Sequence, residues 1–237
     1  MTVRVEAGSG VATLTLDRPA SRNALDLAMC EDLRRAAEGL DASVKLVFVR
    51  AAGPVFCAGA DLKEREGMSE AQVRERRLKA FAAYAALEAL PMPAIAVVEG
   101  PAVGSGCEIA AACDFIVATP AASFRIPEAL RGTVGATQRL PRILGKRLAK
   151  DLMFTGRMLG AEEAERHGLV SRVVAPERLQ AALAEIAKTI LEAPAGALRL
   201  AKRAIDRGVE RDPQGALAVE LAAIEEQLAT GDWLGRK

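Results

Sequence analysis

Hydrophobic and polar positions in the first half of the chain follow a strand period in some segments and a helix period in others. Alternation over Thr2–Val5 and Val11–Leu16, around a Gly-Ser-Gly turn, predicts an opening hairpin. The other predicted strands are Lys45–Val49, Ala94–Val98 and Phe115–Ala118, and the predicted helices are Leu25–Leu40 and Ser69–Leu90, with Ser69 as the cap. Because strands and helices take turns, the pattern predicts crossover units in a sheet that helices cover on both faces.

From Thr137 onward, helical patterns dominate. Pro176 and Pro194 mark helix starts, because proline is tolerated in a first turn. The elements predicted there are the helices Lys146–Phe154, Ala161–His167, Pro176–Leu191, Pro194–Arg207 and Gln214–Ala229, with one strand at Val170–Val174. The sequence therefore predicts an α/β core over residues 1–175 and a helical region over residues 176–237, with no linker between them.

Composition and charge narrow the classes of function. With 32 Lys and Arg against 31 Asp and Glu, and only 3% aromatic residues, the chain lacks the features of a nucleic-acid binder. The basic clusters Arg74–Arg77 and Arg142–Lys150 are expected to be solvated helix faces. The N-terminus has no apolar secretory region and no apolar run is long enough for a membrane span, so we expect a soluble, cytoplasmic protein without a membrane partner.

Cysteine and histidine leave few options for metal or nucleophilic chemistry. The four cysteines (Cys30, Cys57, Cys107 and Cys113) form no CxxC pair and are expected to be reduced core thiols. The single histidine, His167, precedes a glycine and is expected at the C-terminal end of a helix. We therefore expect no metal site, and a Ser-His-Asp triad has only one candidate base.

Three loop segments carry candidate chemistry: 56–64, 100–108 and 124–128. The first two follow predicted strands and are rich in small residues, which let a ligand approach backbone N–H groups that lack a helical partner. Two such donors would stabilise a developing oxyanion, at about 3 kcal/mol for each. Glu108 and Glu128 stand among mostly apolar or small neighbours, which suits general acid–base catalysis, the alternative being paired or partly exposed charges. No dinucleotide or P-loop motif is present.

Together these segments resemble the enoyl-CoA hydratase/isomerase (crotonase) superfamily. The resemblance runs from about Val11 to Val174 and is carried by Arg18-Pro19, Asn23-Ala24-Leu25, FCAGADLKE, GSGCEIAAACD, FRIPE, TQRLPRILG and AEEAERHGLVSRVV. It implies an α/β fold, the crotonase-like spiral of ββα units with a helical C-terminal trimerisation region. It also implies an acyl-CoA thioester substrate, no cofactor beyond the coenzyme A of that substrate, and a homotrimer or a dimer of trimers.

The resemblance also implies roles for individual residues. By motif position, the backbone N–H groups of Ala60 and Ser105 would be the two oxyanion donors. Glu108 and Glu128 match the two glutamates of hydratases, which add water to a 2-enoyl-CoA and give a 3-hydroxyacyl-CoA. The residues implied on the CoA side are Asn23, Ala24, Leu25, Ala58, Gly59, Asp61, Leu62, Lys63 and Gly104.

Other activities stay open at this point. An isomerase would use Glu128 alone to move a proton, and a thioester hydrolase would direct a Glu108-bound water to the carbonyl. A non-catalytic acyl-CoA-binding protein is the third alternative, because loop 132–137 is shorter than the loop that the family usually has. Candidates to line an acyl tail are Met68, Phe81, Tyr84 and Leu130, and Arg236-Lys237 is all that remains of the basic pair that reaches CoA in many members.

Overall fold

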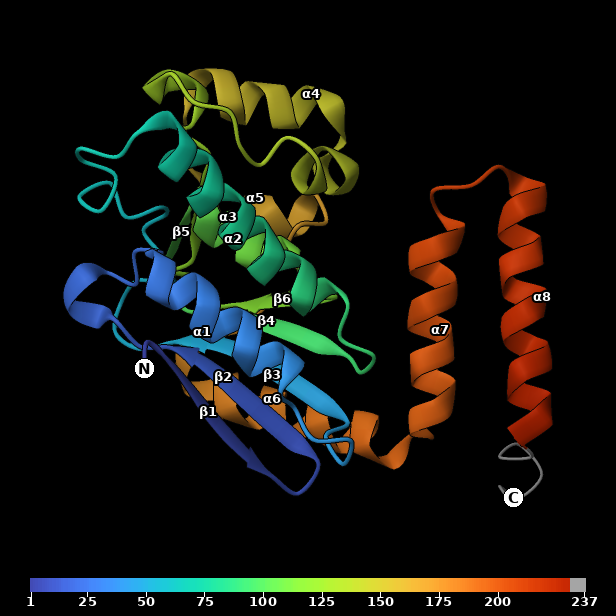
Figure 1. Cartoon of the computed structure of the whole chain (residues 1–237). Coiled ribbons are helices and arrows are strands. Elements are labelled where there is room, and N and C mark those ends of the chain that lie inside the picture. The colour runs from blue at the N-terminus through green and yellow to red at the C-terminus, as the bar shows by residue number, and fades with distance from the viewer. Residues whose placement is uncertain (231–237) are drawn as a thin grey trace.

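A six-stranded sheet forms the centre of the molecule in a computed structural model that describes residues 1–230 (Figure 1). The predicted hairpin is confirmed, since β1 (Val3–Gly8) pairs antiparallel with β2 (Val11–Leu16). The parallel strands β3 (Leu46–Ala51), β4 (Ala94–Val98), β6 (Phe115–Ala118) and β9 (Arg172–Val173) follow in that order. Three of these lie at predicted positions, and the fourth falls within the predicted 170–174 strand.

One helix begins at the cap that the sequence predicts. Ser69 and Gln72 form a capping box at the start of the second helix, so the predicted cap is confirmed. The helices are α1 (Leu27–Glu38), α2 (Glu70–Glu88), α3 (Ser105–Ala111), α4 (Arg139–Thr155), α5 (Ala161–Arg166), α6 (Pro176–Glu192), α7 (Ala195–Gly208) and α8 (Pro213–Thr230), with 3-10 turns η1 (Pro19–Ser21) and η2 (Ala129–Arg131). α4 breaks at Gly145, where φ is 76°, so the predicted start at Lys146 agrees with its second part, whereas its first part, from Arg139, was not predicted.

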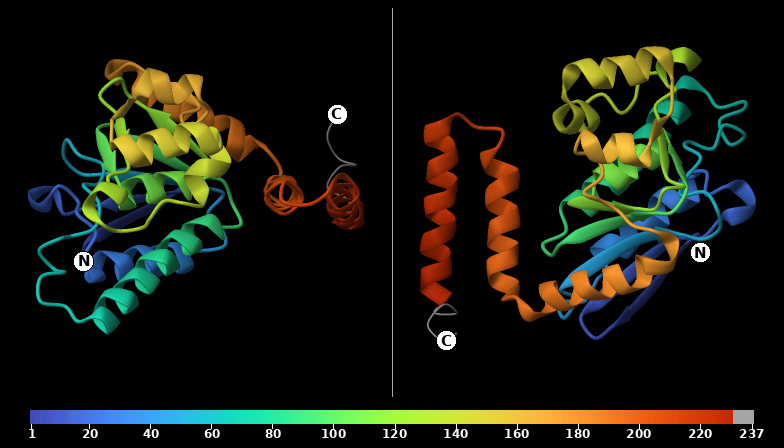
Figure 2. Two further views of the ribbon diagram at one scale, coloured as in Figure 1. Left: turned by 90° about the horizontal axis from the view of Figure 1, so that it is seen from above. Right: turned by 180° about the vertical axis from the view of Figure 1, so that it is seen from behind.

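Alternate residues of the central strands enter two separate cores. Val47 and Val49 of β3 belong to the larger core with residues of α1 and α2, whereas Leu46 and Phe48 belong to a second core with residues of α6. Seen from behind, α6 lies across the face of the sheet opposite α1 (Figure 2). The prediction of a sheet covered on both faces is therefore confirmed.

A second, three-stranded sheet was not predicted. Its strands are β5 (Pro101–Val103), β7 (Ser123–Arg125) and β8 (Leu159–Gly160), with β5 parallel to β7 and β7 antiparallel to β8. Strands this short show too few alternations to produce a periodic signal. Gly104 comes directly after β5, and Glu128 comes shortly after β7. Because β5 pairs with β7, these two residues lie next to each other.

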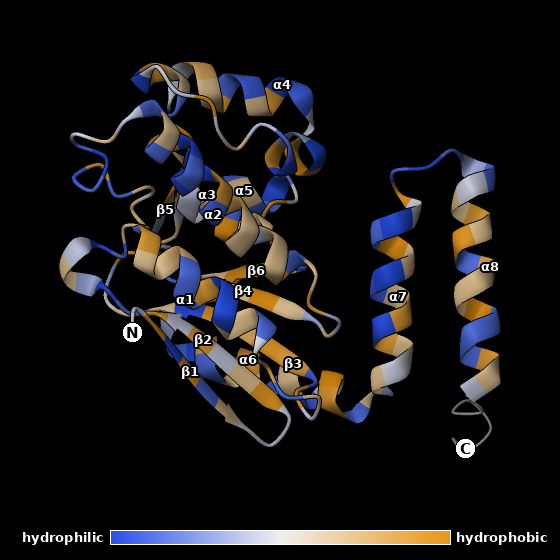
Figure 3. Cartoon of the chain, in the orientation of Figure 1, coloured by the Kyte–Doolittle hydropathy of each residue, from blue (hydrophilic) through white to orange (hydrophobic). Residues whose placement is uncertain are grey.

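The last two helices stand beside the core as a hairpin (Figures 1 and 2). Leu200 and Gly208 are the only buried residues of α7, and α8 has none within the described chain. Lys202 joins α7 to the core through Asp114, with Nζ 3.0 Å from Oδ2. Hydrophobic and hydrophilic residues mix along both helices (Figure 3), so this hairpin leaves apolar surface uncovered.

Predictions about single residues can also be compared with the structure. All four cysteines are buried and free, and burial raises the pKa of Cys30 and of Cys57 to about 12. His167 caps the C-terminal end of α5, as predicted. Within residues 1–230, no helix has the length and apolar character needed to cross a membrane. Arg236-Lys237 lie outside the described residues.

Candidate functional site

The Ala60 N–H is left free by the way its loop is held. Leu25 N donates to Gly59 O at 2.8 Å, and Asp61 N donates to Leu25 O at 2.9 Å. In this parallel bridge Leu25 uses the two neighbours of Ala60, so the Ala60 N–H points away from Leu25. No acceptor in residues 1–230 receives it, and Ala60 lines a small cavity.

Ser105 opens α3 at the same cavity. As the first helical residue it has an N–H without an acceptor inside the helix, and the described chain offers none elsewhere. Gly104 before it has φ +51° and ψ −106°, and a Cβ there would collide with Glu128 Oε1. Glycine is therefore needed both for this backbone conformation and for the close approach of the carboxyl group. Burial raises the pKa of the Tyr84 hydroxyl, and the Ser105 side chain opposes that rise.

Glu108 has a fixed positive partner. It lies in the first turn of α3, only 5% exposed, and its Oε2 accepts from Arg139 Nη1 at 2.9 Å. Glu88 holds the same guanidinium from the other side, at 2.7 and 3.1 Å, and the guanidinium carbon lies 5.7 Å from the centre of the Tyr84 ring. The pairing compensates a buried negative charge and orients the Glu108 carboxylate.

Glu128 has the opposite surroundings. Its Oε2 is buried and has no hydrogen-bond partner in the described residues. Burial raises the pKa of Glu128 above the ordinary glutamate value, and the nearby negative charge of Glu108 raises it further. A backbone hydrogen bond and the charges of Arg131 and Arg77 oppose that rise without cancelling it. The pKa of Glu128 is thus shifted upward beside a Glu108 that has its own counter-charge.

The four residues predicted to be catalytic line one cavity. Ala60, Ser105, Glu108 and Glu128 all contribute to its wall, and its volume is about 90 Å³. A second hollow of about 590 Å³ shares Ala60 and Glu128 with it, and a third of about 520 Å³ shares Glu108. The arrangement can hold a carbonyl oxygen on two backbone donors while carboxyl groups move a proton nearby.

The residues predicted to contact CoA fall into two groups. Those that line the hollow of about 590 Å³ are Ala58, Gly59, Leu62 and Gly104. Asn23 and Leu25 are fully buried, and Asp61 is paired with Arg18 at 3.3 Å. Ala24, Asp61 and Lys63 line none of the hollows considered above. Contact of these residues with CoA stays a prediction.

Asn23 has a structural part to play in its loop. Its Oδ1 accepts from Arg18 N, and its Nδ2 donates to Ala52 O and Val55 O, each at 2.8 Å. The residue takes φ +52°, which asparagine tolerates better than most residues do. All polar groups of this side chain therefore face the protein, and they hold the segment that leads to Ala58.

Sequence reasoning missed the arginines around the cavity. Arg76 was expected on a solvated face, but it is 3% exposed and bonds Glu64 Oε2 at 2.8 Å, so that expectation is wrong. Arg77 donates to Val134 O at 3.2 Å and to Thr133 Oγ1. Arg139 stands in a segment that carried the family resemblance, but its partner Glu108 is 31 residues away, so no local pattern indicates their contact.

The candidates for an acyl pocket are only partly brought together. Phe81 and Tyr84 line the small cavity with the two glutamates, and Met68 lines the hollow of about 590 Å³. Leu130 is 56% exposed and lines neither. An acyl group that entered the small cavity would meet the two aromatic rings on α2.

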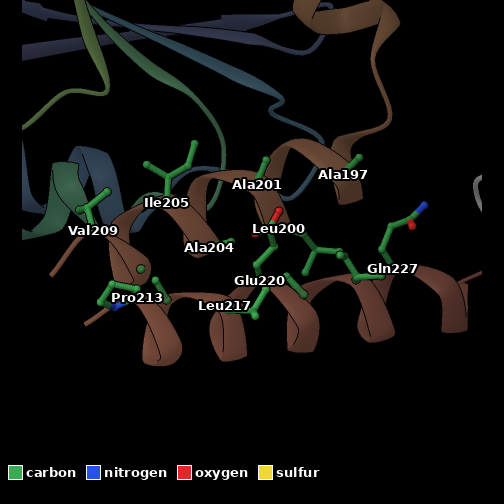
Figure 4. Close-up of a pocket in the computed structure, with 14 residues that line it drawn as sticks. Ala197, Leu200, Ala201, Ala204, Ile205, Val209, Pro213, Leu217, Glu220 and Gln227 are labelled. Atoms are coloured by element: carbon green, nitrogen blue, oxygen red, sulfur yellow. The ribbon is translucent and has the colours of Figure 1, made fainter. Parts of the chain in front are cut away.

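Another hollow, larger than the three above, lies away from this chemistry. It has a volume of about 670 Å³ and runs between α7 and α8 (Figure 4). Leu200, Ile205 and Leu217 are typical of its apolar wall, and Glu220 is the one acidic residue that lines it within the described chain. It has neither the paired carboxylates nor the loop N–H groups of the small cavity.

Comparison with known proteins identifies the family. A family model described as enoyl-CoA hydratase/isomerase matches residues 6–233. The chain belongs to the enoyl-CoA hydratase/isomerase family. The resemblance seen in the sequence is thus confirmed, and the chain is an enzyme of this family.

Individual members of the enoyl-CoA hydratase/isomerase family are similar to this chain along nearly its whole length. The Bos taurus enoyl-CoA hydratase domain-containing protein 2, mitochondrial, is 42% identical over 237 residues, which cover 95% of this chain and 79% of that protein. The Bacillus anthracis enoyl-CoA hydratase structure has a TM-score of 0.95 at 38% identity, covering 99% of this chain and 93% of that one. A Thermobifida fusca protein solved with acetoacetyl-CoA has a TM-score of 0.88 at 28% identity, covering 97% and 95%. The predicted crotonase-like α/β fold is confirmed.

Proposed function

We propose that this protein is an enoyl-CoA hydratase, which adds water to a 2-enoyl-CoA and gives a 3-hydroxyacyl-CoA. One observation carries the proposal: Glu108 and Glu128 line the same small cavity as two unengaged backbone N–H groups from separate loops. Hydration needs a base for water, an acid for the α-carbon and a place for the thioester oxyanion. This cavity offers a candidate for each.

The thioester oxygen would accept from the N–H groups of Ala60 and Ser105. Glu108 takes a proton from a water molecule as the water oxygen bonds to the β-carbon, and the electron pair of the double bond moves toward the thioester oxygen. Glu128 then gives its proton to the α-carbon. The added atoms sum to one water, and a proton passing from Glu108 back to Glu128 restores the starting state.

The surroundings of the two glutamates support this division of roles. Arg139 compensates the charge of Glu108, which must be ionised to accept a proton. Burial raises the pKa of Glu128, which is the direction that suits a proton donor. Two carboxyl groups whose environments differ in this way are typical of an acid and base pair.

The acyl-CoA substrate would enter beside the first oxyanion loop. The hollow of about 590 Å³ reaches Ala60 from the side of Ala58, Gly59 and Leu62. The acetoacetyl-CoA complex of the Thermobifida fusca relative supports a CoA thioester as the ligand. We propose further that the reaction needs no cofactor beyond this CoA and that the protein works in the cytoplasm.

A coupled assay tests the proposal. Purified protein is mixed with crotonyl-CoA, absorbance of the conjugated thioester is followed, and a thiol reagent reports free CoA. Loss of absorbance without free thiol is the expected result. Glu108→Gln and Glu128→Gln should each lower the rate by about a hundredfold or more while acyl-CoA still binds. A variant with an intact rate would overturn the assignment of that glutamate, and free thiol would indicate a hydrolase.

Isomerisation is the second candidate, because Arg139 already occupies one oxygen of Glu108. An isomerase would use Glu128 alone to move a proton between two carbons. A 3-enoyl-CoA offered in the same assay would then gain the absorbance of the conjugated thioester. Glu108→Gln would leave that gain unchanged, whereas Glu128→Gln would abolish it. Binding of CoA thioesters without either change would indicate a non-catalytic protein.

We also propose that the α7–α8 hairpin serves assembly into a homotrimer or a dimer of trimers. Four large apolar residues of this hairpin that are each at least 52% exposed support the proposal: Ile205, Val209, Leu217 and Leu221. Exposed apolar area of this kind is stabilised when a partner covers it. A second copy of the same chain would supply a matching surface.

A further inference from the structure

Arg77 faces the candidate site without an acidic partner. It lies on α2, half buried, and lines both the cavity of about 90 Å³ and the hollow of about 520 Å³. Its guanidinium bonds only neutral oxygens, Thr133 Oγ1 and Val134 O. No carboxylate in residues 1–230 forms an ion pair with it, although most arginines around these hollows have one.

Three neighbouring arginines already have acidic partners. In the wall of the larger hollow, Arg139 contacts Glu88 and Glu108, at 2.7 and 2.9 Å, and Arg142 contacts Glu210 at 2.9 Å. In the small cavity, Arg76 pairs with Glu64 at 2.8 Å. Arg65 also lines the small cavity without an ion pair in residues 1–230, but among the described arginines Arg77 is the one that lines both hollows. An arginine stays ionised in proteins, so the positive charge of Arg77 persists at every physiological pH.

The order of the hollows places Arg77 at the far end of an acyl group. A thioester that enters from the side of Ala58 and binds its oxygen at Ala60 directs its acyl carbons past Glu128. Beyond the small cavity lies the hollow of about 520 Å³, which charged side chains and apolar surface line together. A hydrocarbon tail that extended there would pass the guanidinium of Arg77 and desolvate it without pairing it, which costs free energy.

We propose that the preferred substrate is a short 2-enoyl-CoA whose acyl group ends in a second carboxylate, and that Arg77 binds this carboxylate. The inference rests on the proposed hydratase function. A guanidinium presents paired N–H groups that match both oxygens of a carboxylate. Thr133 and Val134 hold the guanidinium in place, which lowers the entropy cost of binding.

Selectivity between two substrates tests the proposal. The pair is glutaconyl-CoA, which ends in a carboxylate, and its neutral isostere with an isopropyl group in place of that carboxylate. We expect wild type to have a kcat/KM for glutaconyl-CoA at least about tenfold above that for the isostere. Arg77→Met should remove this preference, and Arg77→Lys should keep part of it. Arg74→Met is the matched control, since Arg74 is exposed on the same helix and pairs with Glu70.

Two other results with these substrates would overturn the proposal. Equal losses of kcat/KM for both substrates in Arg77→Met would mean that Arg77 only anchors loop 132–137. A wild type without a preference for glutaconyl-CoA would mean that the site does not recognise a second carboxylate. If neither substrate is hydrated, the proposed hydratase function is wrong. The role of Arg77 is then tested by calorimetry, which compares the affinity for the saturated analogue glutaryl-CoA with the affinity for the neutral isostere of that analogue. Tighter binding of glutaryl-CoA that Arg77→Met abolishes would still support the carboxylate site, and equal binding would overturn it.

Discussion

The small cavity of the core and the large hollow of the C-terminal hairpin differ in almost every respect. The first measures about 90 Å³ and gathers two carboxyl groups, two free backbone donors and three arginines. The second measures about 670 Å³ and has a mostly apolar wall (Figure 4). Volume and apolar character indicate where something could bind, but unpaired polar groups indicate where a reaction could be catalysed. In this molecule the two criteria select different regions.

Burial explains the difference. The core surrounds its site with residues of α1, α2, α3 and the sheet, so a polar group left unpaired there is costly and is retained for a purpose. The hairpin buries only Leu200 and Gly208 of α7 and no described residue of α8. Its apolar residues remain exposed to solvent in the isolated chain. We therefore expect changes in the core to affect chemistry and changes in the hairpin to affect assembly.

Ala60→Pro should have the largest effect. Proline removes the N–H that is proposed to bind the oxyanion, and because this N–H has no acceptor in residues 1–230, no internal hydrogen bond is lost with it. We expect hydration of crotonyl-CoA to fall by about a hundredfold to a thousandfold, with an unchanged molecular mass in solution. Ala60→Gly, which keeps the backbone N–H, is the control. Full activity of Ala60→Pro would exclude Ala60 as an oxyanion donor.

A double change in the hairpin, Leu221→Ser with Leu228→Ser, should come next. The two side chains are 52% and 45% exposed, and burying a leucine is worth about 1.5–3 kcal/mol, so losing both should weaken assembly by a hundredfold or more. Analytical ultracentrifugation would follow dissociation, with Glu225→Ser as the polar control on the same helix. A wild type that sediments as a 25.0 kDa monomer would contradict the proposed trimer.

The sequence predicted the site better where the signal was local. Ala60 and Ser105 stand in loops whose small residues follow predicted strands, and the bounds of β4 and β6 agree with their apolar runs. β5, β7 and β8 were missed because two or three residues cannot show a period, and only pairing with distant residues stabilises them.

The charges of the site were less predictable than its loops. Arg139 and Glu108 are 31 residues apart, and Arg77 is 56 residues from Thr133. Such contacts depend on how α2, α3 and α4 pack, which no local spacing encodes. The same holds for the unpartnered Oε2 of Glu128, since its isolation follows from burial in the folded chain.

Glu128→Gln should have the smallest of these effects, a change in the free energy of unfolding that depends on pH. Because burial raises the pKa of Glu128, the folded state favours the protonated acid. The free energy of unfolding therefore holds its full value below the ordinary carboxyl pKa and decreases as the pH rises through the raised one.

Glutamine carries no charge at any pH, so the variant avoids this decrease. We expect Glu128→Gln to melt a few degrees above wild type near pH 8, with a difference that becomes smaller toward pH 4. Thermal melts across that range would measure it, with Glu185→Gln on the exposed side of α6 as the control. A gain that is the same at every pH would arise from packing of the amide, and a loss near pH 8 would mean that ionised Glu128 has a partner. Either result would remove the asymmetry between the two glutamates on which the proposed proton transfers depend.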